Sequence, residues 1–245
     1  IGGMKIFNFF LIVTIFCFYS CSETNNINYK EQLSDPELFQ AAMQNLTDIV
    51  VYDIFSPPVA SRVYLYPSIA AYEIMAYFNP DNFNSLKDQV KELKDIPTPE
   101  NPNIDSNLAA IFSFNQVGKA LIFSEKKMEI FETNFNNKLK DFGVPRRVIK
   151  ASKEYAEKVS KSILDWASKD MYSQTRTFPK YSILEGDRFW KPTPPDYMDG
   201  IEPHWPKIRT MVLDSSNQFP PKDPIPFDLK KGSTFHKQLM EVYEV

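Results

Sequence analysis

The sequence is poor in the residues on which most catalytic motifs depend. Seven of its 245 residues are glycine, two are histidine and two are cysteine. So few glycines argue against glycine-rich phosphate loops, Rossmann turns and β-hairpin arrays, because these need residues that tolerate positive φ. The net charge of −3 is spread without long runs of one sign, which argues against a nucleic-acid partner. No serine lies in a Gly-x-Ser-x-Gly elbow, so the sequence offers no α/β-hydrolase nucleophile.

Histidine and cysteine form no metal-binding or nucleophilic motif. His204 and His236 lie far apart, and neither has a second histidine at i+4 or an acidic cluster beside it, so neither indicates a zinc or iron site. The two cysteines, Cys17 and Cys21, both lie near the N-terminus. Carboxylates are plentiful, but no pattern selects two of them as a glycosidase pair. We therefore predict no catalytic, cofactor-binding or metal-binding residue in this chain.

The N-terminal residues are typical of a secretion signal. Lys5 precedes an apolar run from Ile6 to Tyr19. This run is shorter than the roughly 20 residues that a membrane-spanning helix needs, but it matches the hydrophobic part of a signal peptide. We therefore assign residues 1–20 to a signal peptide and exclude them from the fold.

The residues that follow predict a lipid anchor. Ser20-Cys21-Ser22 resembles the lipobox of bacterial lipoproteins, in which the cysteine becomes the lipid-bearing first residue of the mature protein. The next residues are polar and suit a flexible tether, so residues 21–34 are assigned to the tether of a lipid anchor. We expect lipidation at Cys21, contact with a membrane through this lipid, and a location in the bacterial cell envelope, at the periplasm or the outer membrane.

Apolar residues recur at helical spacing from residue 35 to about residue 171, which predicts an all-α antiparallel bundle. Several starts carry capping residues, such as Asp35 before Pro36-Glu37 and Ser124 before the stripe that begins at Met128. The stretch 104–123 is apolar on nearly every face and is expected to be the central buried helix. Helices are predicted over residues 35–55, 56–73, 82–94, 104–123, 124–142 and 145–167, and from 233 onward.

Arg62 and Glu73 are the two charged residues of an otherwise uncharged helical stretch. They lie about three turns, or roughly 16 Å, apart on one helix face, so they cannot pair directly. Because buried charges need partners, we expect each to meet a neighbouring helix, with Asp48 or Asp53 binding Arg62. Pro67, between them, removes a backbone donor and is expected to kink or restart the helix.

The chain beyond Met171 is rich in proline, since ten of the nineteen prolines lie from Tyr172 onward. Proline fixes φ and disfavours helix at the preceding residue, so this part is predicted to be irregular and to wrap around the helices. It also carries Trp190, Tyr197 and Trp205. Two interpretations fit these aromatic residues. They anchor irregular chain to a core, or they form a stacking platform of a helical surface lipoprotein that binds a ligand such as a glycan.

Three sequence blocks together resemble one protein family. The blocks are SPPVASRVYLYPSIAAYE at 56–73, DWASKDMY at 165–172 with Thr175-Arg176, and the stretch from Trp190 to Trp205 followed by Leu213-Asp214-Ser215. They resemble the N-terminal half of bacterial vanadium-dependent haloperoxidase-like proteins of the type-2 phosphatidic acid phosphatase superfamily, especially lipoproteins of Bacteroidetes type. The resemblance extends over residues 35–245.

The resemblance implies a helical enzyme with an oxyanion pocket. In the family, vanadate or a phosphoryl group is held by Lys and Arg side chains and a Ser-Gly-His segment, while another His binds the metal or is phosphorylated. This sequence contains no Ser-Gly-His and no Arg-Pro pair. The chain is therefore expected to be the N-terminal, non-catalytic half of a longer enzyme, with the other half of the chain as its partner. The full-length protein would oxidise halide with vanadate and peroxide, or hydrolyse a phosphate ester.

Overall fold

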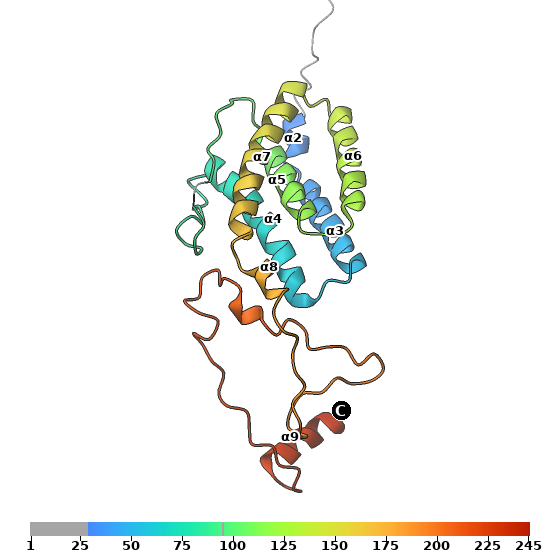
Figure 1. The fold of residues 1–245 in the computed structure, drawn as a ribbon. Helices are drawn as coiled ribbons and strands as arrows, with labels where there is room; N and C mark the ends of the chain where they lie inside the picture. Colours follow the sequence, from blue (N-terminus) through green and yellow to red (C-terminus); the bar gives the residue numbers. More distant parts are fainter. Residues whose placement is uncertain (1–28, 95) are drawn as a thin grey trace, which may run out of the picture. The chain divides into compact units, whose positions relative to one another are not determined.

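The computed structural model describes residues 29–94 and 96–245, and it confirms the predicted all-α fold. No strand occurs in this part of the chain (Figure 1). The signal peptide, Cys17, Cys21 and most of the predicted tether lie outside the described residues. The helices are α2 Tyr29–Leu33, α3 Pro36–Tyr52, α4 Pro57–Phe78, α5 Ser106–Lys119, α6 Glu125–Asp141, α7 Arg146–Ala167, α8 Tyr172–Thr175, the 3-10 helix η1 Trp205–Lys207, and α9 Thr234–Tyr243.

The chain forms two compact units, with the first ending at Ala167 and the second comprising Ser168–Val245. Helices α2 to α7 belong to the first unit, and α8, η1 and α9 belong to the second. Among the described residues, no helix has both the length and the apolar character that crossing a bilayer requires.

Helix α5 is the centre of the first unit, as the sequence predicts. It packs against α4 and α7 most extensively, and also against α3 and α6 (Figure 1). Ten of its fourteen residues are buried, among them Leu108, Phe114 and Val117. The helix is shorter than the predicted range 104–123. Asp105 caps its start by accepting a hydrogen bond from Leu108 N at 3.0 Å, and Ala120 is its C-cap.

The predicted cap of α3 is present. The Asp35 side chain accepts a hydrogen bond from Glu37 N at 2.9 Å, and Pro36 is the first helical residue. One turn earlier, the last part of the range 21–34 that was assigned to the tether forms helix α2. The side chain of Leu33 is buried in the first unit, so the ordered fold begins before residue 35. The polar composition of this short segment gave no sign of that burial.

Helix α4 runs unbroken through Pro67, where a kink or a restart was expected. Its N-terminal proline pair fits the first turn of a helix, where a backbone donor has no intrahelical partner. Pro67 is itself buried, as are Tyr66 and Ile69 beside it. Packing on both sides of the missing hydrogen bond keeps the helix continuous.

The predicted helix over residues 82–94 is absent, and this segment consists of turns. Asp88 and Glu92 have φ of 64° and 61°, in the left-handed region that a right-handed helix excludes. Val90 and Leu93 are nonetheless buried, so the apolar residues that suggested a helix hold a loop against the core. The stretch from residue 97 to 103 is irregular, as its prolines predicted.

Three side chains fix the connection between α4 and α5 onto the helices. Tyr72 Oη donates to Asn84 O at 2.9 Å, and Trp166 Nε1 donates to Lys91 O at 3.1 Å. Tyr155 Oη donates to Pro97 O at 3.1 Å. Burial raises the pKa of Tyr155 to about 12, so this hydroxyl keeps its proton at neutral pH.

The second unit is mostly irregular, as the prolines predicted. All of its residues are described, and none of its apolar side chains is buried. Helix α9 begins at the expected position, with Ser233 Oγ accepting a hydrogen bond from His236 N at 3.0 Å. Its Leu239 and Val242 are exposed.

Candidate functional site

Glu73 is a buried carboxylate that serves the fold. Its exposed fraction is 2%, and it accepts hydrogen bonds from Ser85 Oγ and Leu86 N, both at 2.6 Å. The expected partner on a neighbouring helix is therefore replaced by a hydroxyl and a backbone amide of the loop that follows α4. Two donors of this kind compensate a buried carboxylate, which accounts for Glu73 as a group that stabilises the fold.

Arg62 lies near the point where the first unit ends. Its Nη2 donates to Ala167 O at 3.4 Å, and its guanidinium lies 5.0 Å from the centre of the Tyr66 ring. Of the two partners predicted for it, Asp48 accepts a hydrogen bond from Gln44 at 2.8 Å. The other, Asp53, binds the connection between α5 and α6 through Phe123 N at 2.9 Å.

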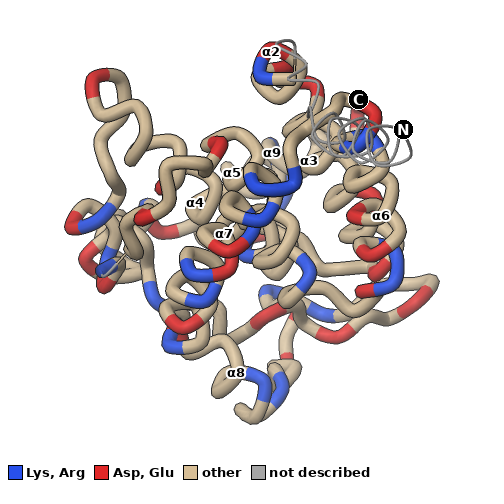
Figure 2. The backbone as a smooth tube through the Cα atoms, turned by 90° about the horizontal axis from the view of Figure 1, so that it is seen from above, with Lys and Arg blue, Asp and Glu red and all other residues tan. Residues whose placement is uncertain are grey.

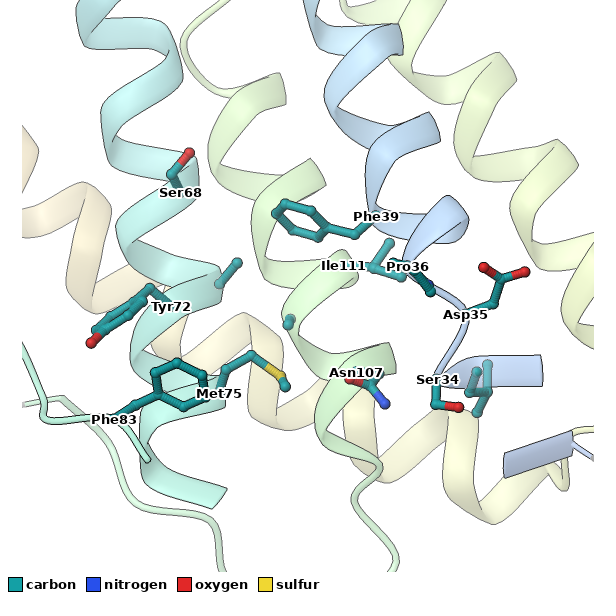
Figure 3. Close-up of a pocket in the computed structure, with 13 residues that line it drawn as sticks. Ser34, Asp35, Pro36, Phe39, Ser68, Tyr72, Met75, Phe83, Asn107 and Ile111 are labelled. Atoms are coloured by element: carbon teal, nitrogen blue, oxygen red, sulfur yellow. The ribbon is translucent and has the colours of Figure 1, made fainter. Parts of the chain in front are cut away.

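An apolar cavity of about 420 Å³ opens between α3, α4 and α5, and it has the size of a small-molecule site. Figure 3 shows its lining side chains, with Tyr72 and Met75 on α4, Phe39 on α3, and Phe83 on the loop after α4. Leu33 closes it from α2. Sequence reasoning missed this cavity, because Phe83 and Leu33 were assigned to a helix and to a tether.

The hydroxyl groups around this cavity are already used by the protein. Ser34 Oγ donates to Glu31 O at 2.7 Å, and Ser68 Oγ donates to Tyr64 O at 2.8 Å. Each of these bonds satisfies a backbone carbonyl near a helix end or within a helix. The cavity is therefore suited to holding apolar groups, and it offers no activated nucleophile.

A second cavity, of about 580 Å³, lies within the second unit. Trp190 and Tyr181 line it with their ring centres 5.6 Å apart in an edge-to-face arrangement, and Asp196 and Asp199 line it as well. Trp190 is half-exposed. Of the three aromatic residues considered in the sequence, only Trp190 lines this cavity, because Trp205 begins η1 and Tyr197 lies outside the lining. Tyr181 was missed for lack of a local motif.

The two histidines take no part in a metal cluster. His204 Nε2 lies 2.6 Å from Pro179 O, and its ring packs edge-to-face on Phe178. His236 lies in the first turn of α9. Within residues 29–94 and 96–245, no group of three or more His, Cys, Asp or Glu residues could hold a metal ion.

Several cations among the described residues are paired with carboxylates. Vanadate binding needs several cationic and imidazole groups that converge on one oxyanion. In the second unit, Arg176 forms a bidentate pair with Glu202, and Lys180 Nζ lies 2.8 Å from Asp199 Oδ2. In the first unit, Lys and Arg are interspersed with Asp and Glu along α6 and α7 (Figure 2). No Ser-Gly-His occurs in the sequence.

Comparison with known proteins identifies a solved structure that is similar to this chain. No family model matches the chain, and neither does any curated protein. The crystal structure of a bacterial vanadium-dependent iodoperoxidase matches 85% of the chain with 45% sequence identity and a TM-score of 0.80. The match covers 50% of the iodoperoxidase chain, so this chain spans about half the length of that protein.

Proposed function

Because this chain is related to the bacterial vanadium haloperoxidase-like proteins, we propose that it is the helical, non-catalytic N-terminal half of a longer enzyme of that kind. The observation that carries the proposal is the 45% identity to an iodoperoxidase chain of which half is matched. The pairing of Arg176 and Lys180 with carboxylates and the missing Ser-Gly-His support the non-catalytic role.

The reaction of the full-length enzyme is the oxidation of a halide, with iodide as the first candidate. Iodide, hydrogen peroxide and a proton give hypoiodous acid and water, and iodide is the species oxidised. Vanadate would supply the Lewis-acid centre that activates peroxide. The residues of this chain contribute packing. Helix α5 supplies the core, and Glu73 fixes the loop after α4.

To test this proposal, the reading frame is sequenced past Val245. The longer protein that it encodes is then expressed beside the 245-residue chain. With orthovanadate and peroxide, the longer protein should convert iodide to triiodide, and the shorter chain should show no turnover. Hydrolysis of p-nitrophenyl phosphate by the longer protein, without iodide oxidation, would establish the phosphatase alternative. Iodide oxidation by the 245-residue chain itself would contradict the proposal that it lacks the catalytic groups.

We further propose that the mature protein is anchored to a membrane of the cell envelope by a lipid on Cys21. The Ser20-Cys21 pair at the end of the apolar run supports this proposal. Expressed with its leader in a bacterium fed a labelled fatty acid, the protein should take up label and partition into detergent. Cys21→Ser should abolish both, whereas Cys17→Ser is the matched control and should change neither. Label uptake by the Cys21→Ser variant would refute the anchor.

A second candidate function is the binding of a glycan or similar ligand at the cavity of the second unit. The half-exposed ring of Trp190 beside Asp196 supports it, because sugars stack on aromatic faces and donate hydroxyl protons to carboxylates. A glycan array probed with the 245-residue chain tests this function. Trp190→Ala should remove any signal, while Trp205→Ala, outside the cavity lining, should retain it. If the array gives no signal, glycan binding is rejected, and the role as the N-terminal half of an enzyme remains the proposed function.

A further inference from the structure

Five apolar residues form an exposed cluster at one end of the first unit. They lie in the last turn of α3, in the turn after it and in the α5–α6 connection. Ile54 is 88% exposed and Phe123 is 77% exposed. The rings of Phe55 and Phe123 stack with their centres 4.8 Å apart, so the two segments form one surface. We call Val51, Tyr52, Ile54, Phe55 and Phe123 the α3-end cluster.

The backbone holds this cluster in a fixed arrangement. The Asp53 carboxylate accepts hydrogen bonds from Phe123 N at 2.9 Å, from Ser124 N at 3.0 Å and from Ser124 Oγ. Ile54 has φ of 55°, a left-handed conformation that is a genuine outlier for a β-branched residue. Strained backbone conformations cluster at functional sites, so an exposed isoleucine held in this conformation points to a functional surface.

The charges and the position of the cluster favour a protein partner over a membrane. Lys127 Nζ lies 3.9 Å from the centre of the Tyr52 ring. In the segments that carry the cluster, Lys126 and Lys127 are matched in number by Asp53 and Glu125, whereas membrane-binding surfaces carry an excess of Lys and Arg. The proposed lipid anchor precedes α2, so the chain enters at the other end of α3. At 1.5 Å per residue, that end is about 25 Å away.

The cluster lies at the end of the first unit from which the chain continues. Arg62, in the second turn of α4, contacts Ala167 O, the last residue of the unit, and α4 starts directly after the cluster (Figure 1). The matched region covers 50% of the iodoperoxidase chain, so half of a protein of that kind lies outside the match, and under the proposed function that half is the C-terminal one. An apolar surface of this extent at this end is suited to receive it.

We propose that the α3-end cluster is the docking surface for the C-terminal half of the longer protein. The proposal rests on the proposed function and deepens it, because it names the surface through which this half holds the catalytic one. The docked half would cover Ile54 and Phe123 with apolar side chains of its own.

Thiol labelling tests the docking directly, because both cysteines of the sequence lie at positions 17 and 21. With these two replaced by serine, Ile54→Cys is introduced into the 245-residue chain and into the longer protein. Maleimide should modify position 54 at least about tenfold more slowly in the longer protein, since a covered thiol reacts only on opening. Phe123→Cys provides a second position if Ile54→Cys fails to fold. Ile130→Cys, on α6 and 63% exposed, is the control and should react equally in both proteins.

Other outcomes overturn the proposal. Equal rates at position 54 in both proteins, or slow rates in both, would show that the C-terminal half does not cover the cluster. Protection of the 245-residue chain that increases with its concentration would assign the cluster to a second copy, and protection by anionic lipid vesicles would assign it to a membrane. A reading frame that stops directly after Val245 would remove the proposed occupant. Iodide oxidation by the longer protein is measured separately, so loss of activity and loss of protection are distinguished.

Discussion

A single carboxylate determines the path of the chain after α4. Glu73 lies in the core with both of its hydrogen-bond donors supplied by Ser85 and Leu86. We expect Glu73→Ala to lower the free energy of unfolding of the first unit by about 2 kcal/mol, because a hydroxyl and a backbone amide lose a charged acceptor. Urea unfolding followed by tryptophan fluorescence measures this. Glu157→Ala, at an exposed position on α7, should change the midpoint little, and an unchanged midpoint for Glu73→Ala would show that water replaces the carboxylate.

Asp53 gives the α3-end cluster a dependence on pH. Burial alone raises the pKa of Asp53, but the hydrogen bonds from Ser124 and Phe123, with the charge of Lys127, outweigh it and hold the pKa below its usual 3.8. Because the pKa of Asp53 is lower in the folded state, its ionised carboxylate stabilises the fold at pH values above the ordinary pKa. This stabilisation is lost as the pH falls through the lowered pKa.

The stability difference between the wild type and Asp53→Asn should therefore be constant near neutral pH and shrink below about pH 3.8. Urea titrations at several pH values measure this difference. Asp48→Asn, at an exposed position on α3, is the control and should be less stable than the wild type by a much smaller amount. A difference for Asp53→Asn that grows on acidification would reverse the sign and refute the assignment.

At the scale of elements, the cap of α3 determines where the first long helix begins. Removing a capping carboxylate costs about 1 kcal/mol, so we expect Asp35→Ala to lower the unfolding free energy of the first unit by that amount. Asp35→Asn should retain most of the stability that the cap contributes, because an amide oxygen also accepts the capping hydrogen bond. Ser233→Ala removes the corresponding cap of α9 and should leave the first unit unchanged. Equal stability of Asp35→Ala and the wild type would show that Pro36 alone sets the start.

The helices that the sequence predicted well are those whose signals are local. The helix starts at Asp35 and Ser233 and the apolar stripes of α6 and α7 need no knowledge of distant residues. The errors arose where a distant group decides. Glu73 draws the chain at 82–94 into turns, and packing keeps α4 helical through Pro67. The burial of Leu33 likewise depends on helices that follow it in the chain.

The candidate cavities could be predicted only in part, for the same reason. Trp190 was singled out in the sequence as an anchor or a stacking residue, and it lines the cavity of the second unit, but its partner Tyr181 is brought to it by the path of the loop. The apolar cavity of the first unit combines residues from α2, α3, α4, α5 and a loop, and no motif connects them. The prediction that this chain carries no catalytic residue remains a prediction.

At the scale of the whole molecule, the two units differ in how much apolar surface they bury. The first has its core on α5 and α7, whereas no apolar side chain of the second is buried. We expect hydrogen exchange of α5 amides to require global unfolding and amides of residues 180–230 to exchange at least about 1000-fold faster, since local opening there breaks few buried contacts. Mass spectrometry of the exchanging 245-residue chain measures this. Equal protection of both regions would mean that the second unit has a core of its own.

The long connection between α4 and α5 is held to the helices up to Glu100, which Lys158 of α7 contacts at 3.0 Å, while residues 101–103 beyond it are exposed. Helices α4 and α5 keep their extensive contact through their own side chains. Residues 101–103 are thus the natural place at which to insert a reporter domain or to open the chain for circular permutation, and the preceding part of the connection is not.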